Sequence, residues 1–200
     1  MAYNFQDSIK GSNPLEKYLA EIHPSIFTQS DGRKSDFKVL GLTAEAKLEA
    51  RKLREVPGIT VVKESDFHKK MIPLIKSNTM KRNTGLSTSK FYIEEYKTEE
   101  RKRGGPWQAL ENGAELYFHW FIQNRNMFFF RTKPFCKWLD DNKLRFIEGL
   151  SEGQRKIDNS SYSSVGLLLP LEEITWKPTK TDWVDTSGNE WKVYFAQFDT

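Results

Sequence analysis

Apolar and polar positions along the first third of the chain predict two helices and a strand. Residues 14–22 place apolar side chains on one helical face behind a first-turn proline. Residues 43–56 predict the clearest helix, because alanines and leucines recur at helical spacing before Pro57-Gly58, which ends it. Residues 59–62 are mostly β-branched and predict a short strand.

The remaining two thirds of the chain predict mainly strands. They are residues 91–97, 115–122, 127–131 and 165–171, with a C-terminal hairpin over 183–184 and 191–195. The polar residues 123–126 predict a hairpin turn, and residues 76–89 predict a loop. A helix over 134–141 is expected to bury Phe135, Trp138 and Leu139.

This order of elements predicts an α/β protein, with a mixed central sheet flanked by helices. Three parts are expected along the chain. They are an N-terminal arm (1–41), an α/β core (42–171) and a C-terminal β appendage packed on the core (172–200).

Composition excludes several classes of protein. The 200 residues are 38% hydrophobic and 14% aromatic, which is typical of a globular chain rather than a disordered one. No apolar run approaches the length of a membrane span, and the first residues do not resemble a secretory signal. A single cysteine, Cys136, excludes an intrachain disulfide and a cysteine-rich zinc site, so a reducing cytoplasm is expected.

Positive charge is concentrated in residues 63–90, which carry an excess of five bases against a net charge of +4 for the whole chain. Such a stretch indicates a phosphate-binding surface, although a solvated lysine-rich surface explains it equally well. The candidate nucleic-acid contacts are Lys69, Lys70, Lys81 and Arg82.

Glu95 and Lys97 form the most suggestive pair for catalysis, because residues two apart on a strand point to the same face. The carboxylate can hold Mg²⁺, which prefers oxygen ligands and activates a bound water. The lysine can orient that water or stabilise the transition state. Glu-x-Lys alone is a weak signal, more often an exposed strand with mixed charges. His119 is expected in the core, and no zinc spacing or phosphate loop is present.

Residues 84–171 resemble the PD-(D/E)XK nuclease superfamily, in the form found in phage-encoded nuclease-like proteins. The resemblance follows the order of five segments: 90–95, 104–107, 113–121, 127–139 and 166–171. It implies a restriction-endonuclease-like core, an active site that uses Mg²⁺ or Mn²⁺, nucleic acid as partner and a phage origin. In that superfamily an Asp opens one strand and a Glu/Asp-x-Lys closes the next.

Two registers of that pattern compete. The first fits the surrounding residues better, but it puts Met71 and Pro73 at the acidic positions and keeps only the lysine, Lys81, which implies a lost metal site. The second takes Glu95 and Lys97 as the catalytic pair and Asp66 as the upstream acid, which keeps a working site.

In the second register Glu45 adds a third metal ligand. A third pairing, Asp36 with Glu45 and Lys47, ranks lowest because residues 43–56 are predicted to be helical. Two functions therefore stay open: a nuclease dependent on Mg²⁺ or Mn²⁺, or an inactive relative that binds a host protein or nucleic acid as an inhibitor or counter-defence factor.

Overall fold

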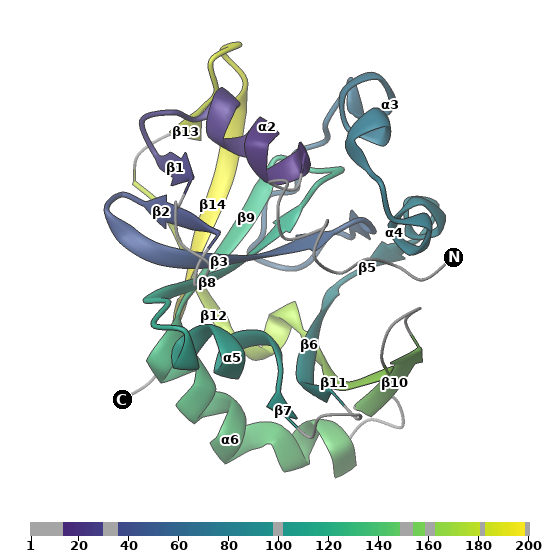
Figure 1. The fold of residues 1–200 in the computed structure, drawn as a ribbon, viewed down its shortest axis with the longest axis vertical. Helices are drawn as coiled ribbons and strands as arrows, with labels where there is room; N and C mark the ends of the chain where they lie inside the picture. Colours follow the sequence, from purple (N-terminus) through teal and green to yellow (C-terminus); the bar gives the residue numbers. More distant parts are fainter. Residues whose placement is uncertain are drawn as a thin grey trace.

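The computed structural model describes residues 14–29, 36–97, 102–148, 154–158, 163–180 and 183–198. Its largest element is an eight-stranded mixed sheet with helices on both faces (Figure 1), which confirms the predicted fold class. In spatial order its strands are β1 (Phe27–Gln29), β2 (Phe37–Val39), β3 (Leu42–Glu49), β8 (Leu116–Phe121), β9 (Asn126–Arg131), β14 (Glu190–Gln197) and β12 (Thr175–Pro178), with β13 (Trp183–Val184) also pairing with β14.

A second, antiparallel sheet has four strands and lies below the first in Figure 1. Its order is β10 (Gln154–Asp158), β11 (Ser163–Pro170), β6 (Lys90–Lys97) and β7 (Lys102–Arg103). A short parallel pair joins β4 (Lys52–Leu53) to β5 (Ser87–Thr88). The helices are α2 (Pro14–Ile22), α3 (Phe67–Lys70), α4 (Asn78–Asn83), α5 (Gly105–Glu111) and α6 (Thr132–Glu148), with 3-10 turns η1 (Ile72–Leu74) and η2 (Leu171–Glu173).

The eight-stranded sheet separates two apolar cores. One face packs against α5, α6 and the four-stranded sheet, and the other packs against α2 and α3. Strand β8 shows why both cores form: Tyr117 and Phe121 enter the first, whereas Phe118 and Trp120 enter the second. We call them the α6-side core and the α2-side core. None of the described helices is long and apolar enough to cross a membrane.

Several predicted elements are confirmed. Helix α2, strand β6, the β8–β9 hairpin, helix α6 and strand β11 lie where the sequence predicts them, although α6 is longer than expected. The C-terminal hairpin is also present as β13 and β14. However, β14 pairs in parallel with β9 inside the eight-stranded sheet, so this segment is an inner strand rather than an addition to the core.

The helix predicted for residues 43–56 is wrong. Residues 42–49 form β3, which pairs antiparallel with β2 and parallel with β8. The physical reason is visible in the chain, because Ala44, Ala46 and Leu48 alternate with polar residues and all face the α2-side core. Tertiary pairing on both edges therefore decides the conformation of a segment with good helix formers.

Two further predictions also differ from the structure. Residues 59–62 form no strand; the amide of Thr60 donates to the Tyr194 hydroxyl at 2.8 Å, and the amide of Val62 donates to the Asn126 side chain at 2.8 Å. Side chains therefore take the place of a neighbouring strand for this segment. The predicted loop 76–89 contains α4 and β5, with Ser77 capping the helix by accepting from the amide of Met80.

Acid is expected to destabilise the protein through His23, at the end of α2. The imidazole is 1% exposed, packs 4.8 Å from the Trp191 ring and, among the described residues, has no hydrogen-bond partner. Burial lowers its pKa from 6.5 to about 4, partly offset by the charge of Asp185. The unfolded chain therefore binds the extra proton first, and stability that is complete above pH 6.5 falls as the pH drops towards 4.

The measurement is the free energy of unfolding in urea between pH 7 and pH 4. A shift of this size corresponds to a loss of at most about 3 kcal/mol from His23. His23→Leu is expected to flatten that part of the slope, whereas the exposed His68→Gln is the matched control and should leave the slope unchanged. An identical slope in wild type and His23→Leu would contradict the assignment.

Candidate functional site

The structure does not assemble the second register of the sequence analysis. Asp66 precedes α3, whose Phe67 packs into the α2-side core. Glu95 lies in β6, whose Phe91 and Ile93 pack into the α6-side core, on the other side of the large sheet. Figure 1 shows α3 and β6 on opposite sides of that sheet. The two carboxylates therefore do not form one metal site.

Glu95 has a structural partner instead. Its side chain is 6% exposed, and its Oε1 atom lies 3.2 Å from Nζ of Lys143 on α6. This ion pair, buried on the Glu95 side, links α6 to the four-stranded sheet. The backbone of Lys97 pairs with Lys102 of β7, and its side chain lies outside the described residues. The expected catalytic pair Glu95 and Lys97 thus gains no support from the geometry around Glu95.

The first register also lacks the strands that it requires. Residues 71–75 form a turn and η1, and Met71 is buried in the α2-side core. Lys81 lies on helix α4 rather than at the end of a strand. Pro73 and Lys81 therefore lie in helical turns rather than on the strands that the register requires.

The third pairing, ranked lowest because of the wrongly predicted helix, lies on two paired strands. Asp36 directly precedes β2, and Glu45 and Lys47 lie in β3, the strand paired with β2. One carboxylate oxygen of Asp36 accepts a hydrogen bond of 2.9 Å from the amide of Ala46, the residue between Glu45 and Lys47. A single residue thus ties the acid that opens one strand to the Glu-x-Lys of the next.

Glu45 and Lys47 share the face of β3 that points to the α6-side core, because Ala44, Ala46 and Leu48 face the other way. Glu45 lies in register with Tyr117 of β8, and Lys47 lies in register with His119. Both residues are only partly buried, whereas their partners on β8 are buried completely. Glu45 and Lys47 are therefore partly accessible to solvent, and they lie next to a buried apolar core.

Negative charge converges on Tyr117. Burial raises the pKa of its phenol well above the usual value, and the charges of Glu45, Glu94 and Asp36 raise it further. Glu94 is 8% exposed and lies against Gly104 at the start of α5, where a larger residue would collide with its carboxylate. Burial also raises the pKa of Asp36, against the lowering effect of its bond from Ala46. The charges of three carboxylates from three different segments therefore act on one buried phenol.

His119 is neutral at pH 7. Burial, followed by the positive charges of Lys47 and Arg51, lowers its pKa well below 6.5. Neither ring nitrogen has a hydrogen-bond partner among the described residues, and the ring packs 4.6 Å from Phe91. The prediction that His119 belongs to the core is confirmed, and Lys47 is the charged group nearest to it in register.

No family model, curated protein or solved structure matches this chain. The site must therefore be judged from its own residues.

The predicted nucleic-acid contacts lie on the short helices α3 and α4, which Figure 1 draws on the right-hand side of the molecule. Lys69 and Lys70 each lie about 4 Å from the carboxylate of Asp66, which partly compensates their charge. Lys81 and Arg82 are exposed, and within the described ranges neither has an acidic partner. The structure thus leaves a basic surface on these helices.

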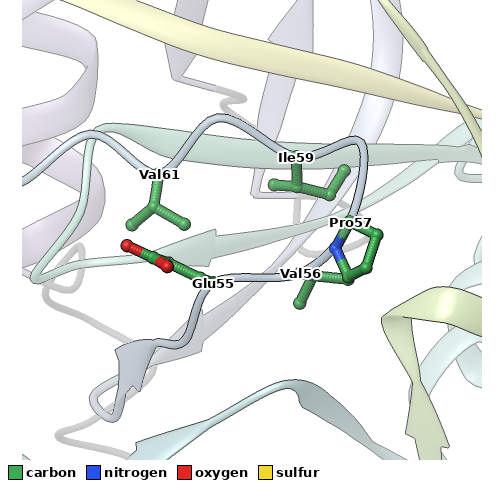
Figure 2. A pocket seen from close by; sticks show the side chains of 5 residues that line it. All are labelled: Glu55, Val56, Pro57, Ile59 and Val61. Carbon is green, nitrogen blue, oxygen red and sulfur yellow. The ribbon is translucent and has the colours of Figure 1, made fainter.

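A pocket of about 440 Å³ is lined by none of these basic residues. Figure 2 shows its lining, formed by the loop over residues 55–61. Four of the five lining side chains are apolar, and Glu55 supplies the carboxylate. This lining offers no pair of acids and no cation, so the carboxylates around Tyr117 remain the better candidate for catalysis.

Proposed function

We propose that the protein hydrolyses phosphodiester bonds in nucleic acid with Mg²⁺ or Mn²⁺, at a site formed by Asp36, Glu45 and Lys47. The observation that supports this most is the bond between the Asp36 carboxylate and the Ala46 amide. It links an acid before one strand to a Glu-x-Lys in the next, as the resemblance to PD-(D/E)XK nucleases implies. Asp36, Glu45 and Lys47 all lie outside residues 84–171, the part of the chain that resembles this superfamily.

The donor set suits a hard divalent cation. Mg²⁺ in enzymes is commonly held by one or two carboxylates, with water and substrate phosphates completing its coordination. Asp36 and Glu45 supply the two carboxylates, and Glu94 adds negative charge nearby. Since burial raises the pKa of Asp36, a bound cation would also stabilise the charged form of that group. When bound, the ion supplies an activated water and neutralises developing charge.

The chain itself supplies the remaining functions. The ammonium group of Lys47 points to the same face as Glu45, where it can hold a phosphate oxygen or orient the attacking water. Tyr117 and His119 close the core behind these two residues and exclude water from that side. The cations Lys69, Lys70, Lys81 and Arg82 can hold the backbone of a longer substrate.

The alternative function is an inactive nuclease-like protein that acts by binding nucleic acid or a host protein. One observation favours it. In the part of the chain that the structure describes, no three His, Cys, Asp or Glu side chains lie close enough together to hold a metal ion. An inactive chain would keep the basic helices α3 and α4 while lacking a stable metal site.

The experiment is a cleavage assay on single- and double-stranded DNA and RNA with Mg²⁺, with Mn²⁺ and with EDTA. The proposal expects cleavage that requires the metal, and a rise in melting temperature with Mn²⁺ that Asp36→Asn reduces. Binding without cleavage under every condition, together with no metal-induced stabilisation, would favour the binding protein instead.

A further inference from the structure

A second pocket, about 360 Å³ in volume, lies where α5 ends and α6 begins. Its lining combines the apolar residues Leu110, Ala114 and Pro134 with Gly113 and the charged residues Glu115, Arg131 and Lys133. A volume of about 300 to 1,000 Å³ with few polar groups is typical of small-molecule sites. None of these residues belongs to the set formed by Asp36, Glu45 and Lys47.

The pocket lining carries more positive than negative charge. Arg131 and Lys133 are exposed, and within the described segments neither has a carboxylate partner. The carboxylate of Glu115 is already engaged, because its Oε2 atom accepts from the amide of Thr43 at 3.2 Å and from its hydroxyl at 3.3 Å. Two cations without partners therefore face the pocket, against one acid that has partners.

The start of α6 adds to the positive potential. This helix is 17 residues long and begins at Thr132, between the two cations. The aligned peptide dipoles favour an anion at such an end.

We propose that this pocket binds a small organic anion, a phosphate monoester or a carboxylate, with an apolar body. The guanidinium of Arg131 and the ammonium of Lys133 hold the anionic group, and Arg131 can do so through two parallel hydrogen bonds. The apolar body packs on Leu110, Ala114 and Pro134. The site is independent of the proposed nuclease activity and is tested by binding alone.

The experiment is isothermal titration of the full chain with phenyl phosphate, inorganic phosphate and benzoate. Phenyl phosphate or benzoate is expected to bind saturably and more tightly than inorganic phosphate, and the tighter of the two identifies the anionic group. The double variant Arg131→Gln and Lys133→Gln should weaken this binding at least ten-fold, since it removes both charged donors. Thr132→Val, which keeps the size of the side chain, should leave it unchanged, because Thr132 is not part of the pocket lining.

Lys177→Gln is the matched control, because it removes an exposed lysine from β12, outside the pocket lining. It should leave the affinity unchanged. Equal weakening by Lys177→Gln and by the double variant would show attraction to net charge alone and would overturn the proposal. Absence of saturable binding by all three probes, in a chain whose melting temperature shows it to be folded, would overturn it as well.

Discussion

Replacement of Lys47 by glutamine is expected to lower the rate of metal-dependent phosphodiester cleavage by about 100- to 1,000-fold, the usual cost of losing one charged group that stabilises a transition state. The reason is its position two residues from Glu45 on the same face of β3. The substitution should leave the fold intact, because Lys47 is only partly buried and its neighbour His119 is neutral. The measurement is kcat/KM on an oligonucleotide, beside the melting temperature.

Two further variants test whether the effect is specific to Lys47. Lys52→Gln removes an exposed lysine from β4, and it should leave kcat unchanged. Glu95→Gln separates the registers: the ion pair with Lys143 predicts a loss of stability with little loss of activity. If Glu95→Gln abolished cleavage of a folded protein while Lys47→Gln did not, the site would lie at β6 and the assignment to β3 would be wrong.

Phe130→Ala is expected to lower the free energy of unfolding by about 3–5 kcal/mol, the range for removing a buried aromatic ring. The ring is completely buried in β9 and stacks on Phe135 of α6 with centroids 4.0 Å apart. It also meets the rings of Phe91 and Trp176 at 5.6 and 5.4 Å. One side chain thus joins the large sheet, the small sheet and α6, and its loss leaves a cavity that three elements border.

Urea denaturation provides the measurement, with Phe195→Ala as the control. Phe195 stacks on Phe129 at 5.2 Å but is only partly buried, so its removal should cost clearly less. A loss below about 1 kcal/mol in the free energy of unfolding of Phe130→Ala would contradict this expectation. It would mean that the surrounding elements move to fill the space left by the ring.

Much of the fold could be predicted from the sequence where apolar residues follow one clear spacing, either that of a helix or that of a strand. The β8–β9 hairpin and α6 are such segments, because apolar runs and a polar turn leave little choice. Residues 42–50 also carry a strict two-residue alternation of apolar and polar side chains. Their good helix formers outweighed this alternation in the prediction, and that error placed Glu45 and Lys47 on a helix.

The candidate site was harder to predict because its members are brought together by pairing over long stretches of chain. Glu45 meets Tyr117 only because β3 and β8 are parallel neighbours, and Glu94 reaches the same phenol from the other sheet. No local pattern reports such pairings. The alternation over 42–50 would have promoted the pairing of Asp36 with Glu45 and Lys47, but it could not have indicated Glu94 or Tyr117.

The position of β14 has a consequence for how the chain reaches its native state. This strand, residues 190–197, lies between β9 and β12, so one side of β9 stays unpaired until a segment far along the chain docks. Until it docks, β9 presents an open edge of phenylalanine-rich backbone, the kind of edge that recruits other chains. Folding should therefore pass through an aggregation-prone intermediate, and the yield of native protein should depend on how quickly the β13–β14 hairpin docks on β9 or how well a chaperone shields that edge.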